Sequence, residues 1–314
     1  MTTRFIALQL CPFSSDLEAE IAQRFEVARW FELDAAARER LLQMRASQVR
    51  AVVTSGSVGC PAELVHSLPN LGVIAVNGVG LDKVDLGLLR QRGIALGTTR
   101  GALSEDVADL AVGLTLALLR DIPASDAYVR SGAWPQAERP LARKVSGKRF
   151  GILGLGQIGL AIAQRLTAFG PVSWSGPREK PVPWVFHHDV LSLARACDVL
   201  VVACPANAST RHLVDAKVIE ALGPQGYVVN ISRGAVVDEP ALTSALAEGR
   251  LAGAALDVYE NEPHVPERLR SLPNTVLTPH VASATHETRR HMADLVLANL
   301  DAYLQGRPLP ATPF

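Results

Sequence analysis

Short apolar runs alternate with amphipathic segments through the first hundred residues of the chain. The runs are rich in aliphatic or β-branched residues, as strands are, and they lie at 4–10, 49–54, 71–76 and 94–96. The segments between them have helical periodicity, at 16–25, 34–46 and 85–92. Strand–helix alternation of this kind predicts a parallel sheet with helices on its faces.

A long helix is predicted next, over residues 104–119. Ser104 is a suitable N-cap and Asp106 falls in the first turn. Apolar residues cover most of the circumference, which predicts burial between layers or between subunits. A further helical segment, 126–132, ends at the sequence Gly-Ala-Trp-Pro that begins at Gly132.

A second alternation begins at residue 149. Strands are predicted at 149–153, 172–174, 198–203, 227–231, 254–257 and 275–277. Helices are predicted at 157–169, 190–196, from 215 onwards, and at 239–248 and 285–303. The pattern predicts an α/β protein with two doubly wound parallel sheets.

Size and charge narrow the class of protein. A chain of 314 residues is long enough for two domains of ordinary size. Lys plus Arg and Asp plus Glu number 31 each and are mixed along the chain. The chain therefore has no net positive charge that would attract nucleic acid or an anionic membrane, and we expect neither as a partner.

The chain shows no sign of a membrane or metal protein. Its longest apolar stretch, 110–119, is shorter than the roughly 20 residues that cross a bilayer. The first ten residues do not read as a signal peptide. The cysteines lack the spacing and the histidine neighbours of a zinc site. We expect a cytoplasmic protein with reduced thiols and no metal.

A glycine-rich turn follows the first strand of the second alternation. Gly154 permits a tight turn, Gly156 lets the backbone approach a pyrophosphate, and Gly159 lets the helix pack close to the strand. The helix that begins at Gln157 and Ile158 then presents free N–H groups to the phosphates. Because the turn lies between a strand and a helix, we interpret it as a dinucleotide site rather than a chance spacing of glycines.

The end of the next strand indicates which nicotinamide cofactor binds. NAD enzymes place an acidic residue there for the ribose hydroxyls, whereas this chain has Ser175 and Gly176, followed by Arg178. A guanidinium can bind a 2′-phosphate. NADP(H) is therefore predicted as the preferred cofactor, with NAD(H) possible if Arg178 is an ordinary surface charge.

Three side chains of the last third lie where strands give way to loops: Arg233, Glu262 and His280. Together they hold the groups that reduce a 2-keto acid. The arginine binds the substrate carboxylate, the histidine donates a proton to the carbonyl oxygen, and the glutamate holds the histidine. Each residue also has an interpretation without a catalytic role: Arg233 as a surface arginine, Glu262 as a loop acid and His280 as a capping histidine.

Taken in order, the motifs resemble the D-isomer-specific 2-hydroxyacid dehydrogenase family, and within it the glyoxylate/hydroxypyruvate reductases. The matching segments are 104–109, 154–159, 230–239, 253–263 and 278–283, with 77–82 and 146–149 suggesting the reductase branch. The resemblance implies a flavodoxin-like substrate domain, residues 1–98 and 286–314. A Rossmann-like cofactor domain, residues 99–285, would be inserted into it.

The resemblance also implies roles for further residues. By analogy, Glu262 raises the pKa of His280, so that the imidazole is a proton donor near neutrality. The amides of Val79 and Gly80, with Ser55 and Gly56, would clamp the substrate. Further positions are implied to contact the cofactor, namely Cys204, Pro205, Ile231 and Asp257.

Trp134 resembles a tryptophan that enters the partner subunit's substrate pocket, and plain packing beneath a loop is the alternative. A homodimer with the 104–134 region at its interface is therefore expected.

The sequence thus predicts an NADPH-dependent reductase of small 2-keto acids such as glyoxylate and hydroxypyruvate. A 2-ketogluconate or aryl-pyruvate reductase with the same machinery is the main alternative. A regulatory protein that senses nicotinamide cofactors is a remote one, since the C-terminal-binding-protein corepressors also resemble this family.

Overall fold

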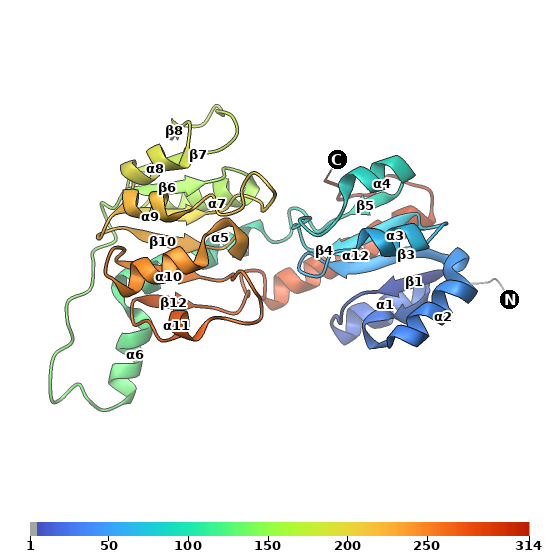
Figure 1. The fold of residues 1–314 in the computed structure, drawn as a ribbon, viewed down its shortest axis with the longest axis horizontal. Coiled ribbons are helices and arrows are strands. Elements are labelled where there is room, and N and C mark those ends of the chain that lie inside the picture. The colour runs from blue at the N-terminus through green and yellow to red at the C-terminus, as the bar shows by residue number, and fades with distance from the viewer. Residues whose placement is uncertain (1–4, 314) are drawn as a thin grey trace. The chain divides into compact units, whose positions relative to one another are not determined.

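The computed structural model describes residues 5–313, and it divides into two compact units (Figure 1). Unit 1 holds the described residues up to Leu103 together with those from Thr285 onwards, and unit 2 is Ser104–Ala284. Each unit has one sheet, and every strand pair in both sheets is parallel. The predicted α/β class with two parallel sheets is confirmed.

Unit 1 has a five-stranded sheet in the order β2-β1-β3-β4-β5. The strands are β1 (Ile6–Gln9), β2 (Glu26–Arg29), β3 (Val49–Ser55), β4 (Val73–Asn77) and β5 (Ala95–Gly97). This order is that of flavodoxin-like folds. The sheet is buried on both faces, which is why its strands read as continuous apolar runs rather than alternating ones.

Helices cover both faces of this sheet. They are α1 (Ser15–Arg24), α2 (Ala35–Arg45), α3 (Ala62–Ser67), α4 (Leu86–Arg92) and α12 (His286–Leu304). Helices α1 and α12 share a core with Ala51, Val53 and Val73, whereas α3 and α4 share the opposite core with Val52 and Ile74. The last helix of the chain therefore completes the first unit.

Unit 2 has a seven-stranded sheet in the order β12-β11-β10-β9-β6-β7-β8. The strands are β6 (Phe150–Leu153), β7 (Val172–Ser175), β8 (Val185–His187), β9 (Val199–Val202), β10 (Tyr227–Asn230), β11 (Gly253–Leu256) and β12 (Thr275–Leu277). The chain builds outwards from β6 on one side and from β9 on the other. The switch point of this doubly wound sheet thus lies between β6 and β9, where such sheets bind ligands.

The helices of unit 2 are α5 (Ser104–Arg120), α6 (Ile122–Arg130), α7 (Gln157–Leu166), α8 (Val190–Ala196), α9 (Ala216–Leu222), α10 (Glu239–Ala247) and α11 (Glu267–Arg270). Helices α8 to α11 pack in one core with Leu200, Val228 and Ala254. Helix α5 packs on α7, and one stripe of its surface is buried. Figure 1 shows α6 and the loop after it standing out from the rest of this unit.

Two strands and two α-helices have no residue range in the sequence prediction: β2, β8, α3 and α11. Strands β2 and β8 are the edges of their sheets, so each pairs on one side only. Both are partly exposed and carry polar residues, such as Glu26 and His187, in place of an apolar run. Within residues 5–313, no helix is long and apolar enough to span a membrane.

Candidate active site

The glycine-rich turn lies between β6 and α7 in unit 2, at the switch point of the sheet. Gly154 has a φ of +95°, and a Cβ atom there would lie 2.6 Å from the backbone of Cys204. A Cβ atom on Gly159 would lie 2.0 Å from the carbonyl oxygen of Gly154. Only glycine fits these two positions, because one needs an unusual backbone conformation and both need close approach.

The third glycine has a different environment. A Cβ atom on Gly156 would meet nothing within 4 Å, so the backbone there faces open space. Gly156 is the N-cap of the ten-residue helix α7, and no side chain caps the helix. The first amides of α7, beginning at Gln157 and Ile158, are at the positive end of the helix dipole. These features fit the pyrophosphate of a dinucleotide.

The segment after β7 contacts this turn. Ser175 is buried and its carbonyl accepts a hydrogen bond from the Gly154 amide at 2.8 Å. Lys180 donates through Nζ to the carbonyl of Leu155, within the turn. Arg178 is exposed between them. Neither Ser175 nor Gly176 carries the carboxylate that NAD enzymes use at the end of this strand, and two cations lie just beyond.

The other predicted cofactor residues lie at the ends of neighbouring strands. Cys204 and Pro205 follow β9, and Ile231 follows β10. The Cys204 carbonyl accepts a hydrogen bond from Ser232 Oγ at 2.7 Å, which joins the two strand ends. Burial raises the pKa of the Cys204 thiol to about 11, so this cysteine is a packing residue rather than a nucleophile.

Arg233 follows β10 and precedes the short 3-10 helix Gly234–Val236. Its carbonyl accepts a hydrogen bond from Asn230 Nδ2 at 3.1 Å, and Asn230 Oδ1 accepts one from the amide of Ser232. The guanidinium donates to the Ser232 carbonyl at 2.8 Å and lowers the pKa of Glu262 by its charge. Asn230 thus shapes the loop that holds the cation near the carboxylate.

Glu262 and His280 form a direct pair, with 2.7 Å between Glu262 Oε2 and His280 Nδ1. The second carboxylate oxygen, Oε1, accepts a hydrogen bond from the amide of Tyr259 at 3.0 Å. Burial raises the pKa of Glu262, but the hydrogen bond and charge of His280 outweigh it, and the net pKa lies below the ordinary value. The carboxylate is therefore ionised and fixes the imidazole through Nδ1, so that Nε2 is the nitrogen that can serve a substrate.

Asp257 shapes the turn that carries His280. Its carboxylate is fully buried and accepts hydrogen bonds from Thr278 Oγ1 at 2.6 Å, the Val281 amide at 2.8 Å and the Ala282 amide at 2.9 Å. His280 itself has a φ of +53°, which is uncommon for a residue with a side chain. Asp257 therefore holds His280 in a strained conformation, and its predicted contact with the cofactor stays a prediction.

Several supporting residues of this site escape the sequence prediction. The single O–H of Tyr259 lies within hydrogen-bond distance of two acceptors, the carbonyls of Leu256 and Thr278, and burial raises the pKa of Tyr259 to about 12. Glu239 is buried and accepts from the Glu260 amide. The sequence does give a signal for Thr278, because this polar residue directly follows a strand, as Asp257 does. Nothing in the local sequence distinguishes Tyr259 or Glu239 from packing residues.

The predicted substrate residues Ser55, Gly56, Val79 and Gly80 belong to unit 1. Ser55 ends β3, Gly56 follows it, and Val79 and Gly80 follow β4; because β3 and β4 pair in parallel, all four lie at the carboxyl edge of the sheet. Within residues 5–313, neither the Val79 amide nor the Gly80 amide has a hydrogen-bond acceptor. Two adjacent, unused amides fit a carboxylate or another anion. In the same part of the chain, no group of three or more acidic, histidine or cysteine side chains could hold a metal ion.

The fold and the site define an oxidoreductase that uses a nicotinamide cofactor. The family model of the D-isomer specific 2-hydroxyacid dehydrogenase, NAD binding domain, matches residues 112–282, which lie within unit 2. The chain belongs to the D-isomer-specific 2-hydroxyacid dehydrogenase family, as its motifs predict.

Relatives and solved structures support this family assignment. Over 304 residues, covering 96% of each chain, this protein is 50% identical to a glyoxylate/hydroxypyruvate reductase A of Arabidopsis thaliana. Over the same length and coverage it is 49% identical to a hydroxyphenylpyruvate reductase of Plectranthus scutellarioides. The crystal structure of an NADPH-dependent glyoxylate/hydroxypyruvate reductase of Sinorhizobium meliloti, with NADP and malonate, has a TM-score of 0.92 at 39% identity. That match covers 98% of this chain and 96% of that one.

Proposed function

We propose that the protein is an NADPH-dependent reductase of small 2-keto acids, with glyoxylate and hydroxypyruvate as substrates. The observation that carries this proposal is the Glu262–His280 pair, with the Arg233 guanidinium close enough to lower the Glu262 pKa. The Arabidopsis relative is a glyoxylate/hydroxypyruvate reductase, which supports the choice of substrates. When bound, the nicotinamide cofactor supplies hydride to the carbonyl carbon.

The protein's own residues bind the substrate and deliver the proton. Arg233 binds the carboxylate by two parallel hydrogen bonds, which fixes the plane of the 2-keto acid. His280 donates from Nε2 to the carbonyl oxygen as the alkoxide develops. Ionised Glu262 stabilises the imidazolium before the proton leaves and holds the ring in place. In the reverse direction, neutral His280 is the base that removes the hydroxyl proton.

Unit 1 is the proposed substrate domain, in which the amides of Val79 and Gly80 would bind the substrate carboxylate. Two N–H groups without a protein acceptor complement the negative charge of a carboxylate. Ser55 and Gly56 lie at the end of the adjacent strand β3 and would line the same region. Unit 2 is the cofactor domain, with Gly154 to Gly159 on the pyrophosphate and Cys204, Pro205, Ile231 and Asp257 along the rest of the dinucleotide.

NADP(H) is the proposed cofactor, and NAD(H) is the weaker one. Arg178 is exposed in the segment after β7, and Lys180 is anchored on the Leu155 carbonyl. These two cations favour a 2′-phosphate, whereas a free 2′-hydroxyl gains nothing from them. The Sinorhizobium structure, which contains NADP, supports the same choice.

The experiment is a matrix of initial rates. NADPH and NADH are each combined with glyoxylate, hydroxypyruvate, 2-ketogluconate and phenylpyruvate at pH 7. We expect the highest kcat/KM for the two small keto acids with NADPH. Highest activity with phenylpyruvate would instead favour an aryl-pyruvate reductase, in line with the hydroxyphenylpyruvate reductase of Plectranthus. No turnover with any pair would contradict the proposal.

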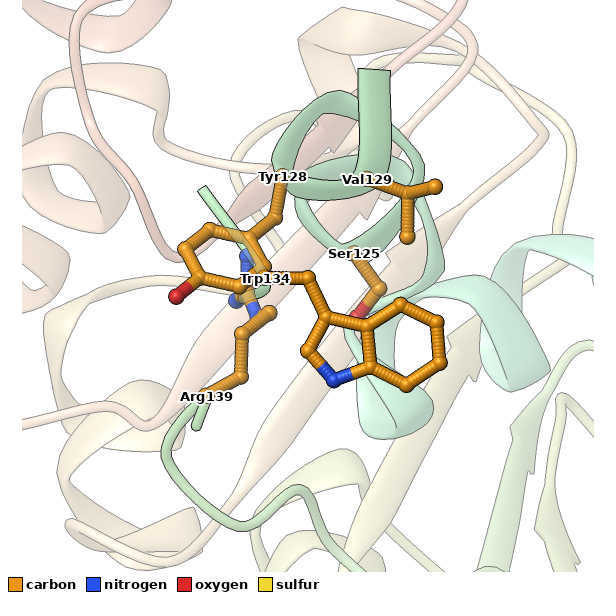
Figure 2. A pocket seen from close by; sticks show the side chains of 5 residues that line it. All are labelled: Ser125, Tyr128, Val129, Trp134 and Arg139. Carbon is orange, nitrogen blue, oxygen red and sulfur yellow. The ribbon is translucent and has the colours of Figure 1, made fainter. Parts of the chain in front are cut away.

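We further propose that the protein is a homodimer whose interface includes α5, α6 and the loop after α6. Large apolar side chains are exposed in this region: Ile122, Val129, Trp134 and Leu141. Figure 2 shows the pocket of about 210 Å³ that Trp134 forms with Ser125, Tyr128, Val129 and Arg139. A segment that stands out from its unit with exposed apolar residues is typical of an interface.

Sedimentation equilibrium tests the dimer. We expect the wild type to have twice the mass of the chain, and a Val129→Glu/Leu141→Glu variant to shift towards the monomer. A wild type that stays monomeric at micromolar concentration would contradict this proposal without affecting the proposed chemistry.

We place the protein in the cytoplasm, which the four buried, unpaired cysteines support.

A further inference from the structure

A second cluster of charged side chains lies in unit 2 around Glu260. Glu260 Oε1 accepts hydrogen bonds from Arg211 Nη2 at 3.0 Å and from His212 Nε2 at 2.9 Å. The Glu260 amide donates to Glu239 Oε2 at 3.2 Å. The Glu260 side chain is 19% exposed and His212 33%, whereas Arg211 is 60% exposed, so the contact with His212 is better shielded from solvent than the contact with Arg211. The reaction proposed above uses none of these four residues.

The backbone beside Glu260 lies directly against the arginine loop. A Cβ atom on Gly234 would lie 1.9 Å from the carbonyl carbon of Tyr259 and 2.3 Å from the amide nitrogen of Glu260. Gly234 is therefore in close contact with the peptide group that joins Tyr259 to Glu260. Because Arg233 precedes Gly234, a shift of this peptide group moves the segment that carries the guanidinium.

The same short segment also holds the glutamate of the catalytic pair. The Tyr259 amide donates to Glu262 Oε1 at 3.0 Å, and Glu262 Oε2 contacts His280. His212 is tied to the arginine loop a second time, because its amide donates to the Ala235 carbonyl at 2.8 Å. One side chain, Glu260, thus joins the loop that begins after β9 to both segments of the active site.

We infer that Glu260, held by Arg211 and His212, is a positioning residue that sets the place of Arg233 relative to the Glu262–His280 pair. The inference rests on the proposed function, since it concerns how the same site binds a 2-keto acid. Glu260 acts through the backbone contact with Gly234 and through the Tyr259 amide. A displacement of about 1 Å in such a site costs up to about a hundredfold in rate.

The test compares three variants with the wild type. Glu260→Ala removes the acceptor, and Glu260→Gln keeps a side-chain oxygen that accepts from Arg211 or His212 Nε2. Glu248→Ala is the control, because Glu248 is an exposed acid of the same unit that pairs with Arg250. The KM for hydroxypyruvate and kcat are measured with saturating NADPH. The Kd of NADPH is measured separately by its fluorescence.

We expect Glu260→Ala to raise the KM for hydroxypyruvate about tenfold, which corresponds to a substrate carboxylate held less well by Arg233. Its Kd for NADPH should stay within about twofold of the wild-type value, since the turn at Gly154 is untouched. Glu260→Gln should recover most of the loss, and Glu248→Ala should match the wild type. A purely structural role would lower the amount of active protein without this selective rise in KM.

The outcomes separate this inference from the proposed function. If the wild type reduces no 2-keto acid, the proposed function fails and so does the premise of the inference. If the wild type is active and Glu260→Ala keeps the wild-type KM, the inference alone is overturned. It is also overturned if KM and the Kd of NADPH rise together without recovery in Glu260→Gln, because the damage is then general.

Discussion

Glu262 Oε2 and His280 Nδ1 lie 2.7 Å apart, although 18 residues separate them in the chain. The carboxylate is held from the other side by the Tyr259 amide, and the histidine turn is held by Asp257. The pair is thus fixed by hydrogen bonds at both ends rather than formed by two mobile side chains. In the proposed reaction, this geometry orients His280 as the proton donor before the substrate arrives.

The Glu262 pair makes stability depend on pH. Burial raises the pKa of Glu262, but the hydrogen bond and charge of His280 outweigh burial, so the folded-state pKa is depressed. A depressed pKa stabilises the fold above the unfolded value, about 4.3 for glutamate, and that contribution is lost as the pH falls through the folded value. The free-energy difference between the wild type and Glu262→Gln should therefore be larger at pH 7 than at pH 4. Urea unfolding at both pH values measures it, and a difference that grows on acidification would contradict the assignment.

In the proposed function, Arg233 binds the substrate through the shape of its guanidinium as well as its charge. Lysine keeps the charge but loses the two parallel donors. Arg233→Lys should raise the KM for glyoxylate by about 10- to 100-fold, the cost of losing one charge-assisted hydrogen bond. Steady-state kinetics check this, with the exposed Arg268→Lys as control. An unchanged KM in Arg233→Lys would rule out two-point binding.

Two glycines of the cofactor turn should respond differently to alanine. Gly156→Ala leaves the fold intact, since its Cβ meets nothing within 4 Å, but it fills the space proposed for the pyrophosphate. Gly154→Ala should instead lower the free energy of unfolding by about 2 kcal/mol or more, because Gly154 has a positive φ and lies against the backbone of Cys204. Thermal unfolding and NADPH fluorescence titration separate the two effects. Normal NADPH affinity in Gly156→Ala would mean that the phosphates bind elsewhere.

The cysteines should be unreactive in the folded protein. All four are buried, and burial raises the pKa of Cys60 and Cys197 to about 12. Ellman's reagent at pH 8 should label the native protein slowly, and all four thiols quickly in guanidinium chloride. A thiol that reacts within seconds in the native state would show that one of these cores opens readily.

The sequence predicts the fold where a residue's role is local. The glycine turn is found because Gly154, Gly156 and Gly159 lie between an apolar strand and a helix, all within ten residues. The buried strands are found from their apolar runs. Strands β2 and β8 are missed because they are partly exposed edge strands whose sequences mix polar and apolar residues, whereas the edge strands β5 and β12 still show short apolar runs.

The site is harder to predict where its contacts join residues that are far apart in the sequence. Asp257 is assigned to the cofactor by resemblance, whereas its hydrogen bonds in the structure come from residues 21 to 25 positions later. His212 belongs to none of the motifs found in the sequence, and its contact with Glu260 spans 48 residues. Such contacts follow from strand order, which the local pattern does not give.

The role of His280 as proton donor is the central claim, and His280→Gln tests it most directly. Glutamine is similar in size and cannot protonate the carbonyl oxygen. The measurement is kcat for hydroxypyruvate reduction at pH 7 alongside the Kd of NADPH by fluorescence. We predict that kcat falls by about a thousandfold, the range of general acid catalysis, with the Kd within about twofold of the wild-type value. A variant that keeps most of its turnover would contradict the account, because the proton would then come from another group.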